Sequence, residues 1–276
     1  MRDFLDRPAG WMPERLAERY DETSFWGARF GALLFDQLDI HPSVTGLEVG
    51  CGAGFPLIEL ANVHGPTSRF TGVDIWVEGL ARARTKIELL GLENVELVEA
   101  DAMSMPFPDA TFDLIVSSLG VNNFKDPKAA FAECRRVAKR GARLAITTNV
   151  EGHFGAFYGM LHAILAERNL EATRAALRTE EAHRLSKEKI SDLLSGLGFS
   201  VTRSFEEGFE MRFADGSAML RHPLVKWFLD GWREAIGPEH ERDILGTAEQ
   251  RLNLAAEREG GIMMMVPMLY LEAVAV

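Results

Sequence analysis

Apolar residues in the first half of the chain come in short unbroken runs that alternate with helical patterns. Such runs are typical of parallel strands buried on both faces, because a strand covered on one face alternates apolar and polar positions. This alternation predicts an α/β fold with a parallel sheet. The expected strands are residues 46–49, 69–74, 95–99, 112–118 and 142–148. The expected helices between them are residues 55–63, 77–90 and 127–139.

The two flanks of this core carry mainly helical patterns. Residues 14–38 repeat apolar positions every three or four residues, which predicts an N-terminal helical segment. Beyond the core, residues 154–169 and 186–197 predict two helices, the second with Ser186 as its N-cap, and residues 198–202 predict a strand.

The last part of the chain is rich in aromatic residues. We expect residues 205–260 to be mostly helical and to form an insertion before the final strand. We place that strand after Pro267, because proline has no N–H to donate in a central ladder.

Three acidic residues stand where predicted strands end. Glu48 lies near the end of the first strand, Asp74 closes the second, and Asp101 follows the third. In an open parallel sheet, ligands bind outside the carboxyl ends of the strands. The three carboxylates are therefore expected at one edge of the sheet.

A glycine-rich turn follows the first strand. Gly50, Gly52 and Gly54 let the backbone turn sharply and let a ligand approach it closely. Asp74 follows at about the spacing of a carboxylate that accepts hydrogen bonds from ribose hydroxyls. A dinucleotide fingerprint would have its third glycine at the position of Phe55, so a dehydrogenase is disfavoured. The alternative is a plain connecting turn beside solvated acids.

Several segments in the core match known motifs in order. They are Leu47 to Gly54 (LEVGCGAG), Val73-Asp74-Ile75, Ala100-Asp101-Ala102 and Pro106 to Asp113 (PFPDATFD). These segments resemble class I S-adenosylmethionine-dependent methyltransferases, especially the small-molecule group that includes ubiquinone/menaquinone biosynthesis methyltransferases. The resemblance implies a doubly wound, seven-stranded, mostly parallel sheet whose last strand is antiparallel. It also implies one domain over residues 1–276, with a helical lid (14–38), a cofactor-binding core (45–148) and a helical cap (205–260).

The resemblance also implies a set of cofactor-binding residues. The glycine turn would contact the methionine portion of S-adenosyl-L-methionine, and Asp74 would hold the ribose hydroxyls. Ile75 would pack on the adenine, and Asp101 would accept from its amino group. The complete expected set is Glu48, Gly50, Cys51, Gly52, Gly54, Asp74, Ile75, Asp101, Ala102, Ser117 and Ser118.

The residues that would face the methyl acceptor are less defined. Many relatives have a histidine pair after the fourth strand, where this chain has Asn122-Asn123, so no general base is assigned there. His153 follows the fifth strand and is either a base or a solvated loop histidine, and we favour the second. Tyr20 either caps the cofactor or packs in the core. No metal site is expected.

The composition of the chain indicates which binding partners and which cellular compartment to expect. The net charge of −11 repels phosphate backbones, so a nucleic-acid partner is not expected. With 2 cysteines, no apolar leader and no membrane-spanning run, the chain is expected to be soluble and cytoplasmic. The oligomeric state stays open.

Taken together, the sequence predicts methyl transfer to a small, partly apolar molecule by in-line displacement. Alignment of the reactants can supply roughly 7–11 kcal/mol of such a barrier, and a base is needed only if the acceptor must lose a proton. The alternatives are a nicotinamide-dependent oxidoreductase, a non-catalytic S-adenosylmethionine-binding module and an RNA methyltransferase.

Overall fold

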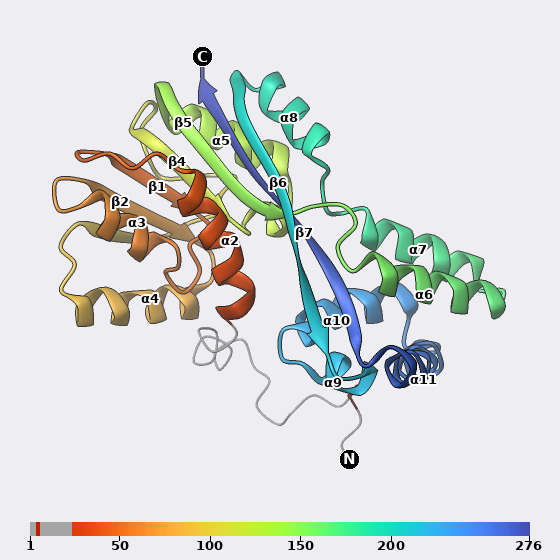
Figure 1. Ribbon diagram of the computed structural model, residues 1–276. Coiled ribbons are helices and arrows are strands. Elements are labelled where there is room, and N and C mark those ends of the chain that lie inside the picture. Colours follow the sequence, from red (N-terminus) through yellow and green to blue (C-terminus); the bar gives the residue numbers. More distant parts are fainter. Residues whose placement is uncertain (1–3, 6–23) are drawn as a thin grey trace. The chain divides into compact units, whose positions relative to one another are not determined.

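The computed structural model describes residues 4–5 and 24–276, and Figure 1 shows the order of its elements. The chain divides into two compact units. The sheet unit comprises Met12–Asn149, Ser186–Glu206 and Met268–Val276. The helical unit comprises Met1–Trp11, Val150–Leu185 and Glu207–Pro267.

A seven-stranded sheet has the strand order β3-β2-β1-β4-β5-β7-β6. Its strands are β1 (Thr45–Val49), β2 (Arg69–Asp74), β3 (Val95–Glu99), β4 (Phe112–Ser118), β5 (Ala138–Asn149), β6 (Phe199–Phe213) and β7 (Ile262–Ala275). The first five pair in parallel, whereas β7 runs antiparallel to β5. The predicted mostly parallel seven-stranded sheet with an antiparallel last strand is confirmed.

Helices cover the central strands of the sheet unit. They are α2 (Ser24–Gln37), α3 (Leu57–His64), α4 (Val77–Leu90), α5 (Pro127–Val137) and α8 (Lys187–Gly196). Figure 1 shows α2, α3 and α4 on one face and α5 with α8 on the other. Strand β1 is buried from Gly46 to Val49, and β4 is buried at nearly every position. Burial on both faces explains the continuous apolar runs.

The helical unit is built around aromatic side chains. Its helices are α6 (Gly155–Glu167), α7 (Glu171–Glu181), α9 (Gly216–Arg221), α10 (Val225–Ile236) and α11 (Glu241–Glu259). Trp232 of α10 is 1% exposed, and its ring centroid lies 4.6 Å from that of Phe157 and 6.1 Å from that of Tyr158. Aromatic pairs at these separations add to the stabilisation from buried area.

Two expectations about the last strands were wrong. Residues 205–213, expected to begin the helical insertion, belong to β6, and helices follow only from Gly216. Apolar residues at alternate positions, such as Phe205, Phe209 and Met211, carry a strand signal that Arg203 and Glu207 interrupt.

Strand β7 begins at Ile262, before Pro267 rather than after it. Pro267 lies just beyond the residues that pair with β5, and its carbonyl accepts a hydrogen bond from the Val150 N–H at 3.3 Å. Pro267 is therefore tolerated in the strand, because its carbonyl accepts a hydrogen bond there and its missing N–H is not required.

Other differences are smaller. Helix α7 was not predicted, and β5 begins at Ala138, inside the range expected for the preceding helix. Ser186 is the N-cap of α8, as predicted, and its side chain accepts from the Lys189 N–H at 3.3 Å. Of the predicted helix at 14–38, the structure describes α2, whereas residues 14–23, including Tyr20, lie outside the described residues.

Candidate functional site

The turn between β1 and α3 is fixed by hydrogen bonds to the end of β2. The N–H groups of Gly50 and Cys51 donate to the Val73 carbonyl at 2.8 and 3.1 Å. The Gly52 N–H donates to Asp74 Oδ2 at 2.7 Å. Gly50 has a φ of +82°, which glycine adopts at little cost. The sequence therefore produces a turn whose shape does not depend on a ligand.

These contacts define what the turn can recognise. The N–H of Gly54 is also engaged, donating to the Cys51 carbonyl at 2.8 Å, and Pro56, which precedes α3, has no N–H. Phosphate sites use free N–H groups at a helix N-terminus. Because the turn uses these N–H groups internally, it is poorly suited to a pyrophosphate.

Glu48 lies beneath this turn and is fully buried. Neither of its carboxyl oxygens makes a hydrogen bond within the part of the chain that the structure describes. Burial raises the pKa of Glu48 well above its ordinary value, the charge of Asp74 raises it further, and the Leu57 N–H lowers it in part. A buried carboxyl whose only nearby donor among the described residues is the Leu57 N–H is suited to binding a cationic group of a ligand.

Asp74 and Asp101 come together at the carboxyl edge of the sheet, as predicted. The Ala100 N–H donates to the Asp74 carbonyl at 3.1 Å, which joins the turn after β3 to the end of β2. Asp74 Oδ1 accepts from the Trp76 N–H, and Asp101 Oδ1 accepts from the Met103 N–H, both at 2.8 Å. Each carboxylate oxygen has more than one lone pair, so both side chains can accept further hydrogen bonds.

Two neighbours of these carboxylates were also expected at the site. Ile75 is 69% exposed, so its side chain is free to pack against a flat ligand. Ala102 is half-buried and directly follows Asp101. The exposed apolar surface beside two carboxylates fits an adenosine group, which has a flat ring system and polar hydroxyls.

Ser117 and Ser118 end β4, on the other side of β1. The Ser117 hydroxyl is buried and donates to the Val49 carbonyl at 2.9 Å, and Ser118 Oγ accepts from Thr147 Oγ1 at 3.0 Å. The next turn lies against the glycine turn, because a Cβ on Gly50 would approach Gly120 Cα to 3.2 Å. The expected residues of the sheet unit thus surround the ends of β1, β2, β3 and β4.

A polar cluster beside this edge was only partly foreseen. Asn122 lies in the short 3-10 helix η2 (Val121–Asn123), and its Nδ2 reaches Thr148 and Asn149 at the end of β5. Thr148 and Asn149 were missed, although they carry the signal that identified Ser117 and Ser118. In both cases polar residues end an apolar strand.

His153 belongs to the helical unit, and the expectation of a solvated loop histidine was wrong. It is 2% exposed and stacks on Phe154 with ring centroids 4.3 Å apart. The Phe154 N–H donates to the Met265 carbonyl at 3.0 Å, so the loop is held by a residue far away in sequence. Burial lowers the pKa of His153 well below its ordinary value, and the charges of Arg184 and His183 lower it further.

Cys51 lies within the glycine turn and is 1% exposed. Burial raises the pKa of its thiol, and the charges of Glu48 and Asp74 raise it further. A thiol that stays protonated is a poor nucleophile, so the chemistry of the turn rests on its shape and its carboxylates.

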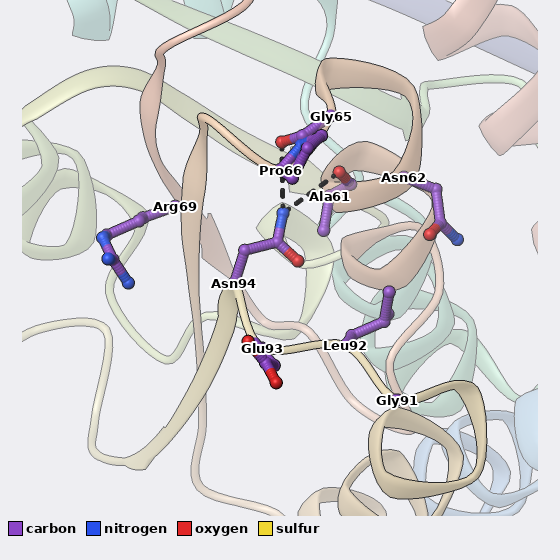
Figure 2. Close-up of a pocket in the computed structure, with 9 residues that line it drawn as sticks. All are labelled: Ala61, Asn62, Gly65, Pro66, Arg69, Gly91, Leu92, Glu93 and Asn94. Carbon is purple, nitrogen blue, oxygen red and sulfur yellow. Dashed lines mark hydrogen bonds between the residues drawn. The ribbon is translucent and has the colours of Figure 1, made fainter.

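A pocket of about 360 Å³ lies elsewhere in the sheet unit, and Figure 2 shows its lining. Arg69, which begins β2, and Glu93, which precedes β3, both line it. Asn94 Nδ2 donates to the carbonyls of Ala61 and Gly65 at 3.3 Å. The pocket is therefore at the amino ends of these strands, opposite the edge that carries Asp74.

Among the described residues, no helix is long and apolar enough to cross a bilayer.

Known proteins resemble this chain over the segment that contains the glycine turn, Asp74 and Asp101. Residues 47–146 match the family model of a methyltransferase domain. A demethylmenaquinone methyltransferase of Bacillus cytotoxicus is 37% identical over 107 residues, which make up 39% of this chain and 45% of the relative. The match thus spans less than half the length of that curated relative. A demethylmenaquinone methyltransferase of Listeria welshimeri is 30% identical over 166 residues, covering 57% of this chain and 70% of the relative.

Solved structures extend the likeness to most of the fold. A SAM-dependent methyltransferase from Aquifex aeolicus aligns with a TM-score of 0.53 and 22% identity, covering 70% of this chain and 92% of that chain. At this identity the likeness concerns the fold alone.

Proposed function

Because this chain belongs to the class I S-adenosylmethionine-dependent methyltransferases, similar to menaquinone biosynthesis enzymes, we propose that it methylates a small, partly apolar acceptor. Two curated relatives are named for a demethylated menaquinone, which supports an acceptor with an apolar ring system. The relatives give no support to the oxidoreductase or to the non-catalytic binding module.

The observation that carries this proposal is the buried carboxyl of Glu48 beside a turn in which the N–H groups of Gly50, Cys51, Gly52 and Gly54 already donate within the protein. A carboxyl beside few available N–H groups fits a cofactor with an ammonium and a sulfonium charge better than one with phosphates. When bound, S-adenosylmethionine supplies a methyl group that the positively charged sulfur has already activated.

We assign the residues of the edge to separate tasks. Gly50, Cys51, Gly52 and Gly54 shape the surface that contacts the methionine portion, and Glu48 attracts its positive charge. Asp74 accepts from the ribose hydroxyls, while Asp101 with the Ala102 backbone accepts from the adenine amino group. Ile75 covers the adenine ring. Ser117 and Ser118 form the floor of the site near the sulfur.

The proposed function also assigns roles to the parts of the chain, a location and a class of acceptor. The core at 45–148 binds the cofactor, while the lid at 14–38 and the helices from Gly216 to Glu259 select the acceptor. Tyr20 stays a candidate for facing the acceptor, whereas the buried His153 is assigned no role there. The free, buried thiols of Cys51 and Cys134 suit a reducing compartment, so the cytoplasm is the proposed location. Nucleic acid is not the proposed acceptor, because the chain carries a net charge of −11.

Thermal denaturation with S-adenosylhomocysteine and with NAD tests the cofactor. A ligand present at 100 times its dissociation constant stabilises the folded state by about 2.7 kcal/mol, so S-adenosylhomocysteine is expected to raise the melting temperature while NAD leaves it unchanged. The opposite result would overturn the proposal in favour of an oxidoreductase.

Release of S-adenosylhomocysteine from S-adenosylmethionine, measured with a panel of hydroxylated naphthalenes, tests turnover. Acceptor-dependent release is expected. Tight cofactor binding without release for any acceptor of a broad panel would favour the non-catalytic alternative.

A further inference from the structure

The amide of Asn122 is held at the carboxyl ends of β4 and β5. Its Nδ2 lies 2.9 Å from Thr148 Oγ1, 2.9 Å from the Asn149 carbonyl oxygen and 2.7 Å from Asn149 Oδ1. Thr148 and Asn149 are themselves buried. The three residues belong to the sheet unit and form one hydrogen-bonded group.

These contacts determine which way the amide points. A backbone carbonyl oxygen only accepts, so the side of Asn122 that faces the Asn149 carbonyl must be the NH₂ group. The Thr148 hydroxyl adds to this arrangement by donating to the same carbonyl at 3.3 Å. The Oδ1 atom of Asn122 is therefore directed away from Asn149.

That oxygen is buried and accepts no hydrogen bond within the described residues. Nearly all buried polar atoms in folded proteins have a partner, which is a protein group, an ordered water or a ligand. Three polar groups hold the nitrogen of this amide in place, while its oxygen atom, Oδ1, has no hydrogen-bond donor among the described residues.

The segment that carries Asn122 is fixed against the glycine turn. A Cβ on Gly120 would approach Ser117 Oγ to 2.5 Å and the Val49 carbonyl oxygen to 2.9 Å, so only glycine fits there. Leu119 has a φ of +60°, and its N–H donates to the Thr147 carbonyl at 2.7 Å. This backbone brings Asn122 to the edge where the proposed methyl donor binds.

We propose that Oδ1 of Asn122 accepts a hydrogen bond from a hydroxyl or N–H group of the methyl acceptor. The inference rests on the proposed function and specifies its acceptor. The site selects molecules that present a hydrogen-bond donor and disfavours ethers and ketones of the same shape. An amide oxygen accepts the hydrogen bond without taking the proton, so Asn122 orients the acceptor and does not act as a base.

Binding of 1-naphthol and of its methyl ether, 1-methoxynaphthalene, tests this inference. Calorimetry would use the full chain saturated with S-adenosylhomocysteine. The two probes share a ring system, but only 1-naphthol donates a hydrogen bond. The wild-type protein is expected to bind 1-naphthol about five- to tenfold more tightly. Equal affinity for the two probes would overturn the proposal without recourse to any variant.

Asn122→Ala should reduce that preference to about twofold or less. Asn123→Ala is the matched control, because the exposed Asn123 donates through Nδ2 to the Leu119 carbonyl and should leave the preference unchanged. A preference that survives in Asn122→Ala would mean that the oxygen holds only a resident water, which also overturns the proposal.

Cofactor binding separates the two possible failures. If neither probe binds while S-adenosylhomocysteine still does, this inference fails and the proposed function stands. If the wild-type protein does not bind S-adenosylhomocysteine, the proposed function itself has failed.

Discussion

Two regions of this molecule differ in how much they share with known proteins. Residues 47–146, which run from β1 into β5 of the sheet unit, match the family model of a methyltransferase domain. The helical unit, built on the aromatic side chains of α6 and α10, lies outside that match. The difference teaches that the part of the chain that resembles known proteins is the part that carries the residues proposed for the cofactor.

The largest expected effect is a loss of stability in the helical unit that leaves the affinity for the cofactor unchanged. Trp232→Ala removes a fully buried indole and should cost about 3–5 kcal/mol of the free energy of unfolding in urea. Because the indole belongs to the other unit, the affinity of the folded variant for S-adenosylhomocysteine should stay within about twofold of wild type.

Glu234→Ala, at an exposed position of the same helix, is the control and should change neither quantity. A parallel loss of stability and cofactor affinity in Trp232→Ala would break the comparison, because it would show that the helical unit takes part in cofactor binding.

The next effect concerns the carboxylate proposed for the ribose. Asp74→Ala should weaken S-adenosylhomocysteine binding by about 1.5–3 kcal/mol while the fold is retained, measured by calorimetry and near-ultraviolet circular dichroism. Asp113 is a matched control at the amino end of β4, where it accepts from the Thr45 N–H and from Lys139. Asp113→Ala should lower stability without lowering affinity. Unchanged affinity in Asp74→Ala would show that Asp74 does not bind the cofactor.

The smallest effect depends on pH and concerns Glu48. Its pKa is raised in the folded protein, so the unfolded chain ionises first as the pH rises. Stability is therefore fully present below the ordinary carboxyl pKa and is lost as the pH rises toward the folded pKa. Glu48→Gln should remove this loss and stabilise the cofactor-free protein by about 1–3 kcal/mol at neutral pH, measured by urea denaturation across a pH series.

The same variant should bind S-adenosylhomocysteine more weakly, because the amide has no negative charge for the ammonium group. Glu99→Gln, at an exposed end of β3, should show neither effect. A variant of Glu48 that loses stability at every pH would contradict the assignment of Glu48 as a buried carboxyl that is poorly compensated within the protein.

Much of the sheet unit was predictable because its signals are local. The expected bounds of β2, β3 and β4 are the observed ones, and Asp74 and Asp101 followed from the rule that parallel strands end at one edge. The burial of His153 was not predictable, because it depends on a contact between the next residue, Phe154, and Met265, which are distant in sequence. The start of β7 was obscured because Met263, Met264 and Met265 are all apolar and hide the alternation of a strand.

The candidate site was likewise predictable only in part. The glycines and acids are recognised by residue type and spacing, whereas the orientation of Asn122 depends on a carbonyl at residue 149. No pattern in the sequence shows that the N–H groups of Gly50, Cys51 and Gly52 are already engaged, because that requires the positions of Val73 and Asp74.

The position of β3 at the end of the sheet has a consequence for the behaviour of the protein at high concentration. An outermost strand exposes backbone groups to which another chain can add. Here the exposed side chains along that strand include Glu96 and Glu99, which would bring like charges together if two such strands paired. Repulsion between Glu96 and Glu99 of two copies would thus oppose pairing of their sheets through β3.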